Sequence, residues 1–161
     1  MKEPVQLKIA AMLKASGRTL SAAESCTGGQ ISHLLTTVSG SSAWYLGSVT
    51  TYATALKEQI LHVPSQVIRK HGLTSSEVAA AMAQGVRALT GSSYAVSTTG
   101  LAEGPDEHYP EGTVWIGVAG PLGTRTRLYQ CDHGRKGNIR SFATAALRFL
   151  ADYIKEDLYK Q

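Results

Sequence analysis

Cysteine is scarce in this sequence. The two cysteines, Cys26 and Cys131, lie in unrelated local contexts, and neither has a second cysteine or a histidine at the spacing of a zinc site. We therefore expect no disulfide framework, no metal and no other cofactor.

Long apolar runs are also missing. No stretch approaches the roughly 18 consecutive apolar residues that a membrane-spanning helix requires. The segment from Met1 to Val5 lacks the apolar stretch and the cleavage site of a secretory signal. The sequence thus predicts a cytoplasmic protein with no membrane partner.

Charge of one sign is not concentrated anywhere along the chain. The formal net charge is +4, but the basic residues are scattered and are not interleaved with aromatic residues. A nucleic-acid partner is therefore not expected, whereas a small anionic substrate fits the charge. With 161 residues, 43% of them hydrophobic, the chain has the size and composition of one globular domain, residues 1–161.

Helical periodicity alternates with β-rich stretches along the sequence. Helices are predicted over residues 4–16 and 30–38, in short pieces within 54–71, over 74–89, and around 139–154; strands are predicted over 19–23, 44–52, 93–99, 112–119 and 124–131. Thr74 and Glu77 have the spacing of a capping box. This alternation favours a three-layer α/β domain whose sheet carries helices on both faces.

Ser25 lies where the first strand meets a Gly-Gly turn and a helix. A hydroxyl at such a position can be exposed beside main-chain N–H groups that stabilise an oxyanion or a phosphate. Ser and Thr are also preferred helix caps, so a capping role for Ser25 and Thr27 is an equal interpretation of the local sequence.

A nucleophilic serine needs a base, and no histidine forms a convincing Ser-His-Asp set. Lys57 follows the second predicted strand, from which it could bring its amine back over the strand ends. It would act as a base only if burial or a neighbouring cation lowered its pKa. Taken alone, Lys57 is more typical of an ordinary surface lysine.

Several sequence blocks together resemble the CinA C-terminal domain family. The blocks cover nearly the whole chain, from about Leu7 to Tyr153, and are AESCTGG at 23–29, GSSAW at 40–44, GSVTTY at 47–52 followed by Lys57, GLTS at 72–75, TGLA at 99–102, GTV at 112–114, and Gly134 with Ile139-Arg140. The resemblance implies a mixed sheet between helices, as in the three-layer prediction. The length resembles that of the stand-alone nicotinamide-nucleotide amidases (PncC type), which implies metal-free deamidation of nicotinamide mononucleotide in pyridine-nucleotide salvage, a part of NAD metabolism.

The resemblance also implies roles for individual residues. Ser25 would be the nucleophile, Lys57 its general base, and Tyr52 a hydrogen-bonding partner that orients the pair. Thr99 and Arg140 would bind substrate. The main-chain amides of Cys26, Thr27, Gly28 and Gly29 are candidates for the oxyanion hole. The candidates for holding the nucleotide phosphate are Arg140, Gly40, Ser41 and Ser42.

Three segments depart from the family pattern. The glycine-rich loop expected after the strand ending near Thr99 is replaced by LAEGPDEH at 101–108, whose carboxylates would repel a phosphate. The Tyr-Ser-Asn pattern after the second strand reads Tyr52-Ala53-Thr54, and Gly-Asp-Arg near the end has become Gly134-Arg135-Lys136. Altered substrate choice and lost activity are both compatible with these changes.

Three other functions compete with the amidase hypothesis. They are a non-catalytic nucleotide-binding paralogue on the same fold, a hydrolase that uses the Cys26 thiolate, and a nucleic-acid-binding module. Self-association into a homo-oligomer is expected from the family resemblance and from the apolar residues of the last helix.

Overall fold

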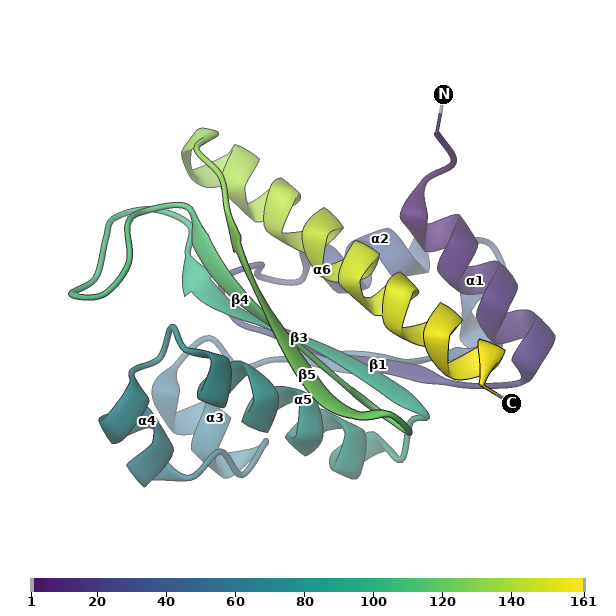
Figure 1. Cartoon of the computed structure of the whole chain (residues 1–161), viewed down its shortest axis with the longest axis horizontal. Helices are drawn as coiled ribbons and strands as arrows, with labels where there is room; N and C mark the ends of the chain where they lie inside the picture. The colour runs from purple at the N-terminus through teal and green to yellow at the C-terminus, as the bar shows by residue number, and fades with distance from the viewer. Residues whose placement is uncertain (1, 161) are drawn as a thin grey trace.

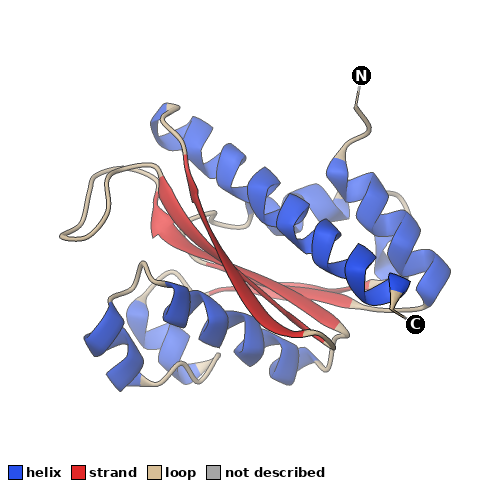
Figure 2. Cartoon of the chain, in the orientation of Figure 1, coloured by secondary structure: helices blue, strands red, loops and turns tan. Residues whose placement is uncertain are grey.

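The computed structural model describes residues 2–160, which form a five-stranded mixed sheet between two layers of helices (Figure 1, Figure 2). The elements in chain order are α1 (Val5–Ser16), β1 (Leu20–Glu24), α2 (Gln30–Thr36), η1 (Ser41–Ala43), β2 (Tyr45–Thr50), α3 (Thr54–Gln59), α4 (Ser65–His71), α5 (Ser76–Thr90), β3 (Tyr94–Leu101), β4 (Thr113–Gly120), β5 (Gly123–Gln130) and α6 (Gly134–Tyr159). The predicted fold class, a mixed sheet with helices on both faces, is confirmed.

The sheet has the strand order β2-β1-β3-β4-β5. β1 lies between β2 and β3 and is parallel to both, whereas β3, β4 and β5 are joined by antiparallel pairs. All five residues of β1 are buried, as expected for a strand covered on both faces. The carboxyl ends of β1, β2 and β3 therefore meet at one edge of the sheet.

The two faces of the sheet have separate apolar cores. Helices α1, α2 and α6 cover one face, and α3, α4 and α5 lie on the other (Figure 1). The larger core includes Leu20, Ile116, Phe142 and Leu150, and the smaller one centres on Met82. Within residues 2–160 no helix combines the length and the apolar character needed to cross a membrane.

The start of α5 differs from the sequence prediction. Its N-cap is Ser75 and not Thr74, and the Ser75 hydroxyl accepts the N–H of Val78 at 3.2 Å. Leu89, near the end of this helix, is largely exposed. The apolar residues of α6 that include Phe142 pack into the larger core, whereas Tyr159 at the end of the helix is exposed.

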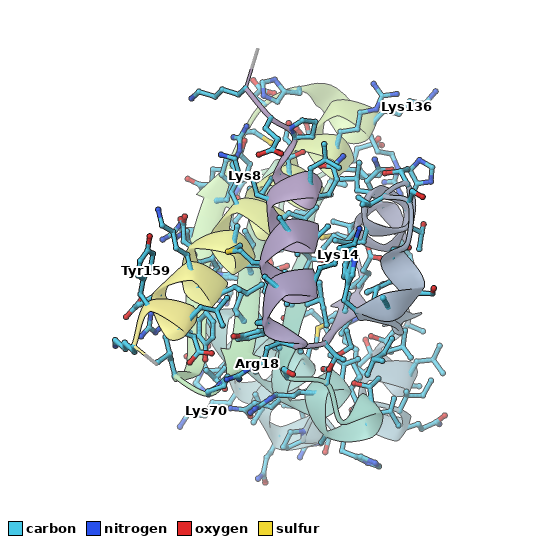
Figure 3. The ribbon with its side chains drawn as sticks, turned by 90° about the vertical axis from the view of Figure 1, so that its right-hand side faces the viewer. Lys8, Lys14, Arg18, Lys70, Lys136 and Tyr159 are labelled. Carbon is cyan, nitrogen blue, oxygen red and sulfur yellow. The ribbon has the colours of Figure 1, made fainter. Side chains whose placement is uncertain are left out.

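The basic side chains come from different elements. Figure 3 labels Lys8 and Lys14 on α1, Lys70 on α4 and Lys136 on α6, spread along the length of the molecule. They do not gather into one patch on this face, as the scattered basic residues of the sequence led us to expect.

Candidate active site

Ser25 and Lys57 meet at the carboxyl edge of the parallel strands. Ser25 is the first residue after β1, and Lys57 lies in α3, which follows the end of β2. Because β1 and β2 are parallel neighbours with Glu24 opposite Thr50, the segments that leave them begin side by side.

The Lys57 amine points into the protein and contacts three oxygen atoms. Its Nζ lies 2.9 Å from Ser25 Oγ, 2.5 Å from the carbonyl oxygen of Thr51 and 3.2 Å from that of Tyr52. The side chain is only 1% exposed, so the interpretation of Lys57 as a surface lysine is wrong.

Burial lowers the pKa of the Lys57 amine below its usual value. In the described part of the chain, no carboxylate lies within salt-bridge distance of Nζ. An uncharged amine has two N–H donors and one lone pair. The two carbonyl oxygens match the two donors, which leaves the lone pair free to accept the proton of Ser25.

The turn after β1 is held by Glu24, a residue to which the sequence analysis gave no role. The buried Glu24 carboxylate accepts the Thr27 hydroxyl at 2.6 Å, the N–H of Ile31 at 2.9 Å and the N–H of Ser32 at 3.0 Å. A carboxylate at this place satisfies donors that the start of α2 leaves free. The sequence does contain a signal for this role: Glu24 is a single acidic residue between an apolar strand and the Gly-Gly start of a helix.

Neither Ser25 nor Thr27 caps α2, so the capping interpretation is wrong. The N-cap residue is Gly29, with no side-chain cap, and the Thr27 hydroxyl bonds instead to Glu24 and Thr98. Gly28 and Gly29 have φ values of 58° and 104°, conformations that favour glycine. Ser25 is therefore free to contact Lys57.

Two main-chain donors lie directly after the serine. Across residues 2–160, the N–H groups of Cys26 and Thr27 donate to no carbonyl oxygen, whereas Gly28 donates to Ser25. Free N–H groups beside a nucleophile can stabilise an oxyanion.

A cavity of about 390 Å³ opens in front of the pair. It lies between the turn after β1, the connection between α4 and α5, the end of β3 and the start of α6. Its lining residues are Ser25, Cys26, Tyr52, Lys57, Gly72, Leu73, Thr74, Thr99, Gly100, Leu101, Ala102, Glu103, Asp106, Glu107, His108 and Arg135. The lining mixes charged and polar side chains with apolar ones, of which Leu73 is exposed.

Tyr52 reaches the pair through its main chain. Its carbonyl oxygen accepts from Lys57, whereas the phenol is 63% exposed and its hydroxyl accepts from Arg135 at 3.4 Å. The orienting contact expected of Tyr52 therefore belongs to its backbone, and the phenol stands at the mouth of the cavity.

The other predicted substrate-binding residues divide between the cavity and other parts of the molecule. Thr99 and Cys26 line it, and the Thr99 hydroxyl donates to the carbonyl of Leu73 at 2.7 Å. Thr27, Gly28 and Gly29 shape the turn and do not line the cavity.

Arg140, predicted to bind substrate, is exposed and does not line the cavity. Arg135, in the first turn of α6, lines the cavity instead. Five residues along an α-helix correspond to about 500°, so the two arginines point in different directions.

Gly40, Ser41 and Ser42 also lie away from the cavity. Ser41 and Ser42 belong to η1, which precedes β2 and therefore lies near the amino ends of the parallel strands. The cavity is at the carboxyl ends of those strands, so these residues cannot contact the same small ligand group as Ser25.

The Cys26 thiol is buried beside the pair. Burial raises its pKa to about 12, and the nearby Lys57 opposes this only in part. The thiolate is the reactive form of cysteine, and it is scarcely populated near neutral pH at such a pKa. The electrostatics therefore argue against the thiol-dependent hydrolase.

The sequence comparisons point to a single family. The family model described as the CinA C-terminal domain matches residues 2–154. The CinA-like protein of Cytophaga hutchinsonii is 40% identical over 157 residues, which are 96% of this chain and 37% of that protein. The CinA-like protein of Salinibacter ruber is 47% identical over 137 residues, or 84% and 33%. The chain thus spans about a third of the length of these curated relatives.

Solved structures share the fold over nearly the full length of both chains. Competence damage-inducible protein A (ComA) from Klebsiella pneumoniae has a TM-score of 0.88 and 28% identity, covering 92% of this chain and 93% of that one. The competence/damage inducible protein CihA from Agrobacterium tumefaciens has a TM-score of 0.85 and 27% identity, covering 93% and 95%.

Proposed function

Because the chain belongs to the CinA C-terminal domain family, we propose that it is a metal-independent amidohydrolase that converts nicotinamide mononucleotide to nicotinate mononucleotide and ammonia. One observation carries the proposal: a buried lysine amine, with no carboxylate partner among residues 2–160, lies 2.9 Å from the hydroxyl of a serine at the wall of a cavity. This is the arrangement that a Ser-Lys hydrolase requires.

The first half of the reaction forms an ester on Ser25. The uncharged Lys57 amine accepts the Ser25 proton while Oγ attacks the carboxamide carbon. The N–H group of Cys26, a residue that lines the cavity, is suited to stabilise the oxyanion of the tetrahedral intermediate. The Lys57 ammonium then returns the proton to the departing nitrogen, and ammonia leaves.

The second half releases the acid. Water attacks the ester carbon while Lys57 accepts a proton from it, and Lys57 then passes this proton to the Ser25 oxygen, which leaves as a hydroxyl. The carbonyl oxygens of Thr51 and Tyr52 hold Nζ in place through both halves. This reaction would place the chain in pyridine-nucleotide salvage.

The proposal is tested by incubating the purified chain with nicotinamide mononucleotide and measuring ammonia and the carboxylic acid product. We expect the two products in equal amounts, and neither with Ser25→Ala. Binding of the nucleotide without release of ammonia would instead assign the non-catalytic paralogue. Loss of ammonia release on addition of a chelator, with recovery on adding metal back, would contradict the metal-independent mechanism.

A further inference from the structure

Negatively charged side chains gather at one wall of the cavity. They belong to the connection between β3 and β4, which projects past the end of the sheet on the side where α6 begins (Figure 1). Three carboxylates of this connection, Glu103, Asp106 and Glu107, line the same cavity as Ser25 and Lys57. The three carboxylates therefore contribute negative charge to the cavity that contains Ser25 and Lys57.

The connection is held in place by its own hydrogen bonds. Asp106 Oδ1 accepts the N–H groups of His108 at 2.8 Å and Tyr109 at 2.7 Å, and Glu111 accepts the N–H of Gly104 at 2.7 Å. The Asn138 side chain of α6 donates to the carbonyl of Ala102 at 2.9 Å. These bonds hold the connection beside the cavity and fix the Asp106 carboxylate directly.

Positive charge at the mouth of the cavity does not balance the carboxylates. Arg135 lines the cavity, and its guanidinium donates to the Tyr52 hydroxyl. His108 lies 3.4 Å from Glu107, so it offsets a carboxylate only when protonated. Lys57 is deeper, and burial favours its uncharged form. The outer cavity therefore has an excess of negative charge.

We infer that the site prefers a pyridinium carboxamide that carries no phosphate, namely the nucleoside nicotinamide riboside, over the mononucleotide. The inference rests on the proposed amidase function and narrows its substrate class. Both molecules present the same carboxamide to Ser25, and both carry a cationic ring that the carboxylates attract. They differ at the far end, where the nucleotide adds a phosphate of the same sign as Glu103, Asp106 and Glu107.

The reaction is the same for both substrates. The carboxamide and one water give a carboxylate and an ammonium ion, the C–N bond breaks, and the nitrogen leaves as ammonia that takes up a proton from solvent. No oxidant, reductant or second substrate is needed.

Initial rates with nicotinamide riboside and nicotinamide mononucleotide test this preference. We expect kcat/KM to favour the riboside by about tenfold at low ionic strength and by less in high salt, because salt screens exposed charges. In the double variant Glu103→Gln, Glu107→Gln the ratio should move toward the nucleotide. Asp106 is left intact because its carboxylate holds the connection.

A matched control makes the same change in total charge elsewhere. Glu3→Gln with Asp152→Asn alters two carboxylates that do not line the cavity and should leave the substrate ratio unchanged. A wild-type preference for the nucleotide, or a ratio that shifts equally in both double variants, would overturn the inference.

Binding measurements distinguish a failure of this inference from a failure of the proposed function. Titration calorimetry on Ser25→Ala measures the affinities of the two ligands without turnover. If wild-type protein releases no ammonia from either compound, the amidase proposal fails, while tighter binding of the riboside still supports the charge selection. Equal or tighter binding of the nucleotide to Ser25→Ala refutes it, whatever the catalytic result.

Discussion

Lys57 Nζ lies 2.9 Å from Ser25 Oγ, although the two residues are 32 positions apart in the sequence. The contact exists because β2 pairs alongside β1, so that α3 starts next to the turn that follows β1. The proposed chemistry depends on that strand pairing as much as on the two side chains.

Replacing the serine should abolish ammonia release, whereas replacing the adjacent cysteine should not. Ser25→Ala removes the proposed nucleophile, and we expect a loss of at least about a thousandfold in kcat. Cys26→Ala is the matched control, since it lies one residue away and lines the same cavity. A steady-state ammonia assay checks both. Greater loss in the cysteine variant would restore the thiol mechanism.

Activity should rise with pH through the lowered pKa of Lys57. Below that pKa the amine is protonated and cannot accept the serine proton, so kcat falls on the acid side. The midpoint should lie below the pKa of about 10.4 of a free lysine. Lys57→Arg, whose guanidinium stays charged, should be inactive at every pH tested. If the rate stayed constant from neutrality to pH 10 and also failed to fall below pH 7, Lys57 would not be the base.

The buried amine should make stability depend on pH in a defined direction. Its folded-state pKa is lowered, so between that value and about 10.4 the unfolded chain binds more protons than the folded one, and the free energy of unfolding rises with pH. Lys57→Met has no amine at this position and therefore lacks this increase in the free energy of unfolding with pH. Its thermal midpoint relative to wild type should therefore fall as the pH is raised from 7 to 10.

The control for this stability measurement is Lys8→Met, a substitution on the exposed surface of α1. Its midpoint relative to wild type should change little over the same range. A parallel response of the two variants would mean that the Lys57 amine is not desolvated.

Glu24→Gln should weaken the turn that carries the serine. The two carboxylate oxygens of Glu24 accept three donors, and an amide would turn its NH₂ toward one of them. We expect a loss of about 1–3 kcal/mol in the free energy of unfolding. Urea denaturation measures this, with Glu3→Gln as the control. In enzyme assays kcat should fall more than KM changes, because the carboxylate positions Ser25 without contacting substrate. An unchanged urea midpoint would remove Glu24 from this structural role.

Gly85→Ala should destabilise the protein in spite of the better helix propensity of alanine. A Cβ at this position would lie 2.2 Å from the carbonyl oxygen of Leu61, so one of the two segments must move. The expected loss is about 1–3 kcal/mol, which exceeds the roughly 1 kcal/mol that alanine gains in a helix. Because Val63 donates to the carbonyl of Lys57, activity should fall as well. A raised thermal midpoint would show that the contact is relieved without cost.

The order of the elements could be predicted from the sequence because hydrophobic periodicity is local. The position of Ser25 at a strand end followed from the same pattern. The burial of Lys57 could not be predicted in this way, since a lysine in a short helix is ordinarily exposed and its surroundings here come from the ends of two paired strands.

Which of the predicted site residues line the cavity also depends on packing. Arg140 and Arg135 both lie near the start of α6, and only the way the helix packs on the sheet decides which one lines the cavity. Ser41 and Ser42 are near Ser25 in sequence, yet η1 and the turn after β1 lie at opposite ends of the parallel strands. Local sequence patterns show neither how a helix packs on the sheet nor at which end of the parallel strands a segment lies.

The separation of the two halves of the sheet has an evolutionary consequence. The proposed nucleophile and base come from segments that follow the parallel strands β1 and β2, whereas the charged wall comes from the hairpin between β3 and β4. Insertions, deletions or exchange of that hairpin can therefore diversify ligand preference within a lineage while the reacting atoms stay where they are. Grafting the hairpin from a relative would be a direct way to change which ligand the cavity accepts.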